Sequence, residues 1–355
     1  MKKIVILHYS LGGTGGLSKL STTIANYWAE QGHKVTRIGL DEPYVKSPYK
    51  VSSKVKQMQL RKNMEVSTNK FTLKPSFIKG ILTTLFPINI KIKERLNKEL
   101  SKQDVIIVQN PMVLRWLNKK NKQKTTLYMH HQFGGGALMG KMIRFQARYI
   151  KKYIGRVVCL DPKTEKILNE KFKNIEFKFI PNFLNEKLGK INDKRDKITF
   201  MGRVAHIKNI DWIVEAAKEI DENIYIYGNI APDYENIWNK MEKPKNLKYM
   251  GRTSESMKVL SETKIGLHTG KIEGYSLSMV ESACSGNILV SADSWDSFDP
   301  QLKNIIHIAS TKEEFIQSLK KALKQKNPSE KEIMKLREYF SFEKYIQNLE
   351  SYIFI

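Results

Sequence analysis

Cysteine is scarce in this sequence, with only Cys159 and Cys284 in 355 residues, and both lie among apolar or small residues. Two such thiols indicate a reducing compartment and give no disulfide framework. No run of 18 apolar residues is present, and the apolar part of the opening MKKIVILHYS is too short for a signal peptide. We therefore expect a cytoplasmic protein without a transmembrane helix.

Acidic residues are scarce in the first half of the chain only. Residues 1–180 carry 35 Lys or Arg and 11 Asp or Glu, whereas residues 181–355 carry 26 and 25, so almost the whole net charge of +25 belongs to the first half. Such asymmetry predicts an anionic partner for the N-terminal half, whether nucleic acid, an anionic membrane surface or a polyphosphorylated substrate. The hydrophobic content of 41% is that of a globular chain.

Short β-branched runs alternate with segments of helical period along the chain. The runs are residues 3–10, 34–40, 104–110, 125–131, 156–161, 177–182, 197–203, 223–229, 247–252, 264–270 and 287–293. Because near-continuous apolar strands separated by helices are typical of parallel sheets covered on both faces, we predict an α/β protein. The pattern restarts near residue 197, after the Pro181-Asn182 turn, which indicates two Rossmann-like domains. The final segment, 341–355, predicts one more amphipathic helix.

A glycine-rich turn, LGGTGGLSKLS at residues 11–21, follows the first predicted strand and opens a helix. It is not a dinucleotide fingerprint, because Ser18 stands where the third glycine would be needed, and it lacks the G-K-[ST] end of a P-loop. Glycines at a helix start favour the close approach of a phosphate or a sugar hydroxyl. A tight turn with ordinary helix caps is an equal alternative.

Another predicted strand end, MGRVAHIKN at residues 201–209, carries Arg203 and, five residues later, Lys208. Two cations that follow the end of one strand can bind a pyrophosphate together. Arg binds it through the paired hydrogen bonds of its planar guanidinium, and Lys binds it as a point charge. Taken alone, the pair is explained better by ordinary surface charge.

The segment IEGYSLSMVESACSG, residues 272–286, lacks Lys and Arg but contains two acids eight positions apart, Glu273 and Glu281. It predicts a loop followed by a helix from about residue 276 to 285, and the unpaired main-chain amides of Ser276 and Leu277 at its start favour an anion. The two carboxylates would flank that anion site and accept hydrogen bonds from vicinal sugar hydroxyls. Interaction with the helix dipole explains each Glu separately, but it does not explain the small side chains between them.

These motifs together resemble the retaining glycosyltransferases of family 4, which have the GT-B fold. The E-G-[FY]-G-L-x-x-x-E-A element of that family is matched by Glu273, Gly274, Tyr275, Ser276, Leu277 and Glu281, and its G-R-[LV]-x-x-x-K element by Gly202, Arg203, Val204 and Lys208. The I-P-N turn between the domains is matched by Ile180, Pro181 and Asn182, and the N-terminal glycine loop by Gly15 and Gly16. The motifs follow in the family order over nearly the whole chain. Two departures are present, because Ser276 replaces the usual Gly and His268-Thr269 replace the usual Pro-Ser.

The resemblance implies an α/β protein of GT-B fold, with two Rossmann-like domains facing each other across a cleft. The first expected domain comprises residues 1–170 and receives the C-terminal helix, residues 336–355, which crosses back to it. The second expected domain, residues 171–335, would bind the nucleotide-sugar donor.

For the site, the resemblance implies that Arg203 and Lys208 neutralise the donor diphosphate, that Glu281 holds the ribose and that Glu273 holds the donor sugar. His130 or His131 would contact the same sugar, and its position favours His130. The expected catalytic residues are His130, Glu273, Arg203 and Lys208. The expected donor-binding residues are Gly15, Gly16, Gly202, Arg203, Lys208, Glu273, Gly274, Tyr275, Ser276, Leu277 and Glu281.

The implied reaction transfers a hexose or N-acetylhexosamine from a nucleotide sugar, with UDP as the expected nucleotide, to a glycan acceptor with retention of configuration. We find no D-x-D triplet, so neither a divalent metal nor another cofactor is expected. The acceptor hydroxyl would attack from the front face, and the leaving phosphate would take its proton. A Lys- and Asn-rich composition, common in low-GC bacterial genes, fits synthesis of a capsule, O-antigen, exopolysaccharide or teichoic acid.

The basic first half also has an expected purpose, because N-terminal domains of this family hold the acceptor and dock at membranes. Residues 46–82 contain nine Lys or Arg and one acid, Glu65, and apolar residues such as Phe77 and Leu82 mix with the lysines. This composition predicts peripheral docking at the inner face of the cell membrane, where a lipid-linked or polyanionic glycan acceptor would be reached. An interior helix with a solvated basic edge is the alternative.

Two other functional classes compete with transfer from a nucleotide sugar. A basic nucleic-acid-binding protein would explain the charge, but the basic stretches contain no recognisable reader motif. A glycoside hydrolase could use the paired Glu273 and Glu281, but it has no need of a phosphate-binding helix start. Salt-dependent binding to random duplex DNA would favour the first class, and release of free sugar without a nucleotide would favour the second.

Overall fold

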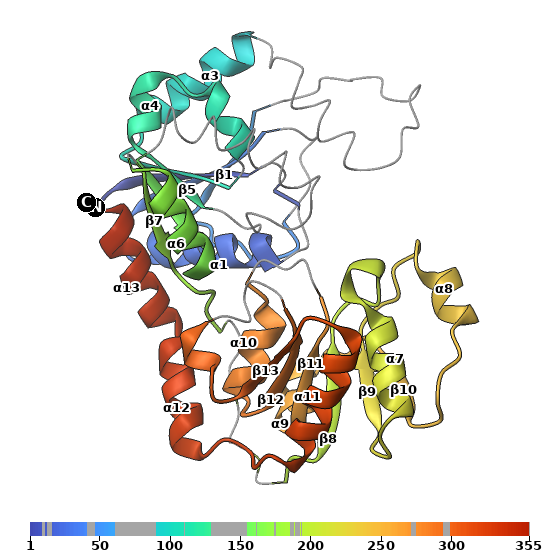
Figure 1. Cartoon of the computed structure of the whole chain (residues 1–355). Coiled ribbons are helices and arrows are strands. Elements are labelled where there is room, and N and C mark those ends of the chain that lie inside the picture. Colours follow the sequence, from blue (N-terminus) through green and yellow to red (C-terminus); the bar gives the residue numbers. More distant parts are fainter. Residues whose placement is uncertain are drawn as a thin grey trace. The chain divides into compact units, whose positions relative to one another are not determined.

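The chain forms two compact units in this computed structural model, and each unit is a sheet with helices on both faces (Figure 1). The structure describes residues 1–8, 11–12, 16–40, 47–60, 90–109, 111–128, 155–160, 162–173, 175–184, 188, 192, 194–270, 275–293 and 299–354. In these ranges no helix is both long enough and apolar enough to cross a membrane. The predicted α/β architecture with two Rossmann-like sheets is confirmed.

Unit one comprises residues 1–159, 165–178 and 350–355, and unit two comprises residues 160–164 and 179–349. The chain therefore passes between the units at residues 159/160, 164/165, 178/179 and 349/350, whereas the domain bounds expected from the resemblance were 170/171 and 335/336.

Unit one is built on a seven-stranded sheet in the order β3-β2-β1-β4-β5-β6-β7, in which the pairings from β3 to β6 are parallel. Its strands are β1 (Lys3–His8), β2 (Lys34–Gly39), β3 (Lys56–Gln59), β4 (Val105–Val108), β5 (Thr125–Tyr128), β6 (Arg156–Cys159) and β7 (Glu176–Phe179). Its helices are α1 (Gly16–Glu30), α3 (Ile90–Ser101), η1 (Pro111–Trp116), α4 (Lys119–Gln123) and α6 (Pro162–Lys171).

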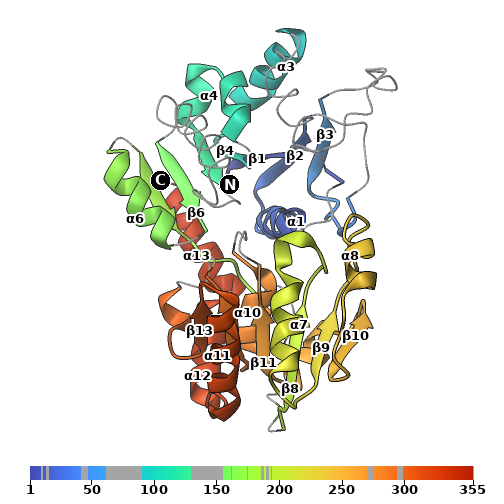
Figure 2. The same ribbon diagram turned by 45° about the vertical axis from the view of Figure 1, so that its right-hand side comes forward.

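Helices α1 and α3 cover opposite faces of this sheet (Figure 2). The helix α1 buries Leu20, Ile24 and Trp28, which are spaced four residues apart and so lie on one side of the helix. It ends before Gly32, whose φ of 83° is the left-handed conformation that glycine adopts readily after a helix. Leu96 of α3 lies in the core on the opposite face of the sheet.

Unit two is built on a fully parallel six-stranded sheet in the order β10-β9-β8-β11-β12-β13. Its strands are β8 (Lys197–Met201), β9 (Ile224–Tyr227), β10 (Leu247–Gly251), β11 (Thr263–His268), β12 (Ile288–Ala292) and β13 (Ile306–Ala309). Its helices are η2 (His206–Lys208), α7 (Ile210–Lys218), α8 (Glu235–Lys240), α9 (Ser256–Ser261), α10 (Leu277–Cys284), η4 (Pro300–Leu302), α11 (Lys312–Lys324) and α12 (Glu330–Tyr339). Helices α7 and α11 pack together on one face, and α10 packs with α9 and α12 on the other (Figure 1).

Two strands, β3 and β13, are absent from the sequence prediction. Both lie at an edge of their sheet, where one side of the strand has no neighbour. The sequence of β3, KQMQ, has no β-branched residue, and in β13, IHIA, His307 interrupts the apolar residues. Both strands therefore lack the apolar run by which the other strands were recognised.

The last helix, α13 (Phe342–Ile353), begins in unit two, and its final residues belong to unit one. There the Trp28 indole donates a hydrogen bond to the Glu350 carboxylate at 2.8 Å. The Tyr352 hydroxyl donates to the main-chain oxygen of Glu176 at 2.6 Å and accepts from the Val157 N–H at 3.0 Å. The amphipathic helix predicted over 341–355 is therefore present, and its end is anchored in the N-terminal unit. The expected start at residue 336 is wrong, because residues 336–339 form the end of α12.

Candidate functional site

The candidate site lies in unit two, where strands β8 and β11 lie side by side at the centre of the sheet. From β8 the chain continues to β9 on one side, whereas from β11 it continues to β12 on the other side. The connections thus leave in opposite directions, and in open α/β sheets ligands bind at this switch point, beyond the carboxyl ends of the strands. The loop after β8 contains Arg203 and Lys208, and the loop after β11 leads into α10.

The position of Arg203 is set by main-chain contacts with the loop that follows β9. The N–H of Gly202 donates to the Tyr227 oxygen at 2.9 Å, and the N–H of Val204 donates to the Asn229 oxygen at 2.9 Å. Gly228 has a φ of 143°, and a Cβ there would lie 1.9 Å from the Gly202 oxygen. The close approach therefore requires glycine, and it leaves the Arg203 side chain exposed at the strand end.

Lys208 is held beside the loop after β11 by two neighbouring side chains. Asn209 adopts the left-handed conformation, with a φ of 41°, and its amide donates to the Thr269 oxygen at 2.8 Å. The fully buried Thr269 hydroxyl donates in turn to the main-chain oxygen of Lys208. One hydrogen bond is thus donated from the loop after β8 and the other from the loop after β11, and together they join the two loops. The half-buried Lys208 lies at this junction.

His268, the last residue of β11, brings a neutral imidazole to the same junction. Burial, with a smaller contribution from the positive charge of Lys208, lowers the pKa of His268 to about 3. Its Nε2 is buried and makes no hydrogen bond with any described residue. At neutral pH this side chain therefore adds a polar group without adding charge beside Lys208.

Helix α10 presents its N-terminus from the loop after β11. The Ser276 side chain caps the helix by accepting from the Met279 N–H. Among the described residues, the main-chain N–H groups of Leu277 and Ser278 have no acceptor, so they are suited to bind an anion. Glu281 lies one turn further on, on the same side of α10 as Leu277, and is half-buried. The helix predicted from about residue 276 to 285 is confirmed.

The loop that precedes α10 is anchored through Tyr275. The Tyr275 ring is buried, and its hydroxyl donates to Oδ2 of Asp299 at 2.5 Å. Asn182 donates to the main-chain oxygen of Tyr275 at 2.7 Å. Burial raises the pKa of Asp299, and the hydrogen bond from Tyr275 opposes that rise. The side chain of Tyr275 and its main-chain carbonyl are thus both engaged in contacts inside the protein.

The structure brings together at this edge Gly202, Arg203, Lys208, Tyr275, Ser276, Leu277 and Glu281. Gly16 is the first residue of α1 in unit one. The predictions for Gly15, His130, His131, Glu273 and Gly274 fall outside the described residues. All of the assigned roles in donor binding and catalysis stay predictions.

The sequence analysis missed two residues that support the site, Asn209 and Thr269. An Asn directly before an amphipathic helix was the available signal for Asn209, because Asn tolerates the left-handed conformation better than most residues. Thr269 had been noted only as a departure from the family pattern, and a sequence gives no sign of which carbonyl a hydroxyl will reach.

Residues 195–325, which contain both loops and α10, match the sequence model of the family described as Glycosyl transferases group 1. An uncharacterized glycosyltransferase of Haemophilus influenzae is 26% identical over 303 residues, which are 81% of this chain and 79% of that protein. Sucrose-phosphate synthase from Thermosynechococcus elongatus has a similar structure, with a TM-score of 0.76 at 13% identity over 99% of this chain and 98% of that one. Anabaena HepE, in complex with UDP and glucose, gives 0.71 at 11% identity over 99% of both chains. The fold is therefore that of the GT-B glycosyltransferases, and residues 195–325 form a domain that matches the glycosyl transferases group 1 family.

Proposed function

We propose that the chain transfers a hexose or N-acetylhexosamine from a UDP-sugar to a glycan acceptor. The observation that carries this proposal is the hydrogen-bonded junction at the switch point, where the loop with Arg203 and Lys208 is tied to the loop that leads into α10. Two cations and two open helix amides at one sheet edge suit a diphosphate, which leaves the sugar as an anion. The similarity to HepE, whose structure contains UDP and glucose, supports UDP as the nucleotide.

The proposed reaction retains the configuration of the sugar. The bond between the anomeric carbon and the diphosphate oxygen breaks, and the acceptor oxygen forms its bond on the same face while its proton passes to the leaving diphosphate. Arg203, Lys208 and the amides of Leu277 and Ser278 stabilise the charge that develops, and no divalent metal takes part. In this proposal Glu281 holds the ribose, whereas Glu273 and His130 hold the donor sugar.

The acceptor in this proposal is lipid-linked or polyanionic and belongs to a cell-surface polysaccharide. Support comes from the charge of the first half of the chain, where Lys and Arg outnumber Asp and Glu by 35 to 11. The protein would work at the inner face of the cell membrane, held there by its basic N-terminal half. Most of the basic segment 46–82 lies outside the described residues. Vesicles of anionic lipid at low salt test the docking, and a protein that stays in solution with them contradicts it.

Isothermal titration with UDP, GDP and ADP tests the donor assignment. We expect UDP to bind most tightly and Lys208→Gln to weaken its binding at least tenfold, because a charge beside the diphosphate is lost. Lys240→Gln removes the same charge from an exposed position at the end of α8 and serves as the matched control. If none of the nucleotides binds, or if both variants lose the same affinity, the proposal is wrong.

A further inference from the structure

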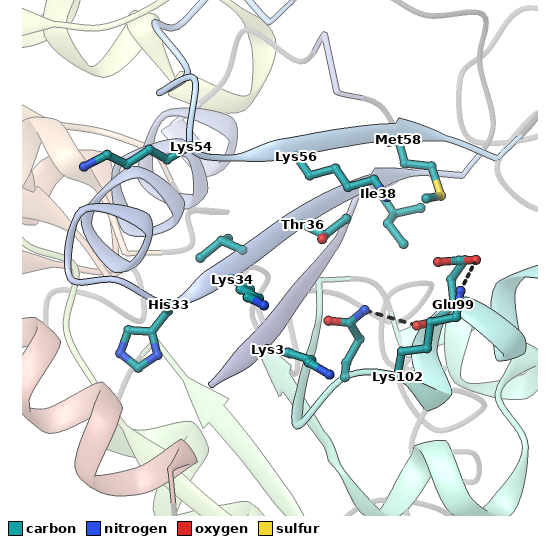
Figure 3. A pocket seen from close by; sticks show the side chains of 12 residues that line it. Lys3, His33, Lys34, Thr36, Ile38, Lys54, Lys56, Met58, Glu99 and Lys102 are labelled. Carbon is teal, nitrogen blue, oxygen red and sulfur yellow. Dashed lines mark hydrogen bonds and ion pairs between the residues drawn. The ribbon is translucent and has the colours of Figure 1, made fainter. Parts of the chain in front are cut away.

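A second charged site lies in unit one, where strands β1, β2 and β3 begin. A pocket of about 460 Å³ opens there beside the C-terminal end of α3, and Figure 3 shows its side chains. Five lysines line it against a single acid, Glu99; they are Lys3, Lys34, Lys54, Lys56 and Lys102. All of these elements belong to one unit, so the pocket is complete within it.

The register of the sheet places lysines side by side on one face. Lys3 of β1 is directly opposite Lys34 of β2, and Thr36 of β2 is directly opposite Lys56 of β3. Because side chains alternate along a strand, Lys34 shares its face with Ile38, which lies in the core under α3. Like charges on neighbouring strands destabilise a sheet. Lys3 and Lys34 are both exposed and therefore repel each other through solvent, and an anion between them would relieve this repulsion.

Two of the five lysines have acidic partners. Lys102 pairs with Glu99 at 2.8 Å, and this bond is the main cause that lowers the pKa of Glu99. Lys54 pairs with Glu30, and Figure 3 shows its side chain extending away from the other lysines. The one acid of the lining is thus already neutralised by one of its lysines.

The other three lysines, Lys3, Lys34 and Lys56, form no ion pair with any described residue. The nearby carboxylate of Asp104 accepts from the main-chain N–H of Lys3 at 2.7 Å, so it is partly satisfied by the main chain. His33 also lines the pocket, and burial is the main cause that lowers its pKa, so its ring is neutral at pH 7. The pocket therefore presents three positive charges that no ion pair within the described part of the chain neutralises.

We propose that this lysine pocket, defined by Lys3, Lys34 and Lys56, binds a soluble or lipid-borne ligand that carries at least two phosphate or sulfate groups. Ammonium groups bind such anions as point charges, and the volume suits a ligand larger than a single phosphate. Ile38 and Met58 supply an apolar side to the same pocket.

The lysine pocket is separate from the edge of the sheet at which the strands end. Lys34 begins β2 and Gly39 ends it, so about 17 Å of strand separates the pocket from the carboxyl ends. A ligand bound in the lysine pocket therefore takes no part in the chemistry at the carboxyl ends of the strands. The pocket instead holds a substrate or attaches the protein to a surface.

Isothermal titration with inorganic tripolyphosphate tests the pocket in the full chain, with UDP present in excess so that the proposed diphosphate site is occupied. We expect Lys34→Gln/Lys56→Gln to bind at least tenfold more weakly than the unchanged protein. Lys93→Gln/Lys98→Gln removes the same charge from exposed positions of α3, and its affinity should stay within about twofold. Equal losses in both double variants, or no binding by the unchanged protein, would overturn the proposal.

Two further measurements separate the sources of the ligand and exclude misfolding. Flotation with vesicles of phosphatidylcholine and cardiolipin, whose headgroup carries two phosphates, should lose Lys34→Gln/Lys56→Gln if a lipid headgroup is the ligand. It should recover this variant as well as the unchanged protein if the ligand is a soluble phosphoglycan. The melting temperature of this variant without ligand should equal or exceed that of the unchanged protein, because like-charge repulsion is relieved. Its affinity for UDP should be unchanged, and a parallel loss of UDP binding would contradict a second site.

Discussion

The side-chain amide of Asn209 donates a hydrogen bond to the main-chain oxygen of Thr269 over 2.8 Å and joins the loops that follow β8 and β11. Thr269 returns a hydrogen bond from its hydroxyl to the main-chain oxygen of Lys208. The position of Lys208 thus depends on two residues that need not contact a ligand themselves. Such supporting bonds hold a charged side chain in place before the ligand arrives.

We predict that Asn209→Ala destabilises the protein by about 2 kcal/mol. One part is the lost hydrogen bond, about 1 kcal/mol, and the other is the similar cost of alanine in a left-handed conformation. Asn209→Gly loses the hydrogen bond but fits the φ of 41°, so it should be the more stable of the two variants. Urea unfolding compares them, and equal or reversed stabilities would show that the conformation of Asn209 carries no strain. Both variants should also bind UDP more weakly.

Ser276 is the position at which the family prefers glycine, and here its side chain caps α10. Loss of an N-cap side chain costs about 1 kcal/mol when alanine replaces serine and only a few tenths when glycine does. We therefore expect Ser276→Ala to lower the urea midpoint clearly and Ser276→Gly to change it little. UDP binding by Ser276→Gly should be retained, because the amides of Leu277 and Ser278 remain. A Ser276→Gly variant as unstable as Ser276→Ala would show that the hydroxyl does more than cap the helix.

The buried Asp299 carboxylate forms hydrogen bonds of different length with two tyrosines. It accepts from the Tyr275 hydroxyl at 2.5 Å and from the Tyr339 hydroxyl at 3.3 Å. Tyr275→Phe should lower the free energy of unfolding by about 2 kcal/mol, as expected for a hydrogen bond to a charged group, and Tyr339→Phe by less. Because the Tyr275 bond opposes the rise in the pKa of Asp299, that pKa should rise further in Tyr275→Phe. Carboxyl NMR follows it directly, and an unchanged pKa would contradict the assigned bond.

Most of the fold could be predicted from the sequence because its central strands are buried on both faces. A strand such as β4, with the sequence VIIV and every residue buried, gives a continuous apolar run that stands out between helices. The edge strand β3 has the sequence KQMQ and gives no such run. Its pairing with β2 depends on contacts across the sheet, which local sequence does not encode.

The site was predictable where a single motif carries the chemistry, and not where support comes from distant residues. The helix start at Ser276 could be placed because its cap and the following apolar residues are adjacent in sequence. Asp299 accepts a hydrogen bond from the Tyr275 hydroxyl, and the two residues are 24 positions apart in the sequence. Nothing in the sequence around Asp299 indicates that contact. Thr269 and Asn209 are 60 residues apart and meet only because β8 and β11 are neighbours.

His8, the last residue of β1, is expected to make the protein sensitive to acid. It is buried, and burial together with the charge of Arg37 lowers its pKa from 6.5 to about 3. In the unfolded chain the imidazole takes up a proton as the pH falls below about 6.5, whereas in the folded protein it stays neutral. The free energy of unfolding should therefore be highest above pH 6.5 and should fall as the pH drops from there towards 3, by up to about 1.4 kcal/mol per pH unit.

His8→Gln isolates this effect, because its side-chain oxygen can still accept the hydrogen bond that Arg37 Nε donates to the His8 Nε2 at 3.2 Å. Between pH 6.5 and 5.0 the variant should lose about 2 kcal/mol less stability than the unchanged protein in urea unfolding. His268→Gln should reduce the loss of stability in acid in the same way, since the pKa of His268 is also lowered to about 3. If NMR shows the His8 ring of the folded protein titrating near pH 6.5, the imidazole is not held neutral, and the acid sensitivity must come from other groups.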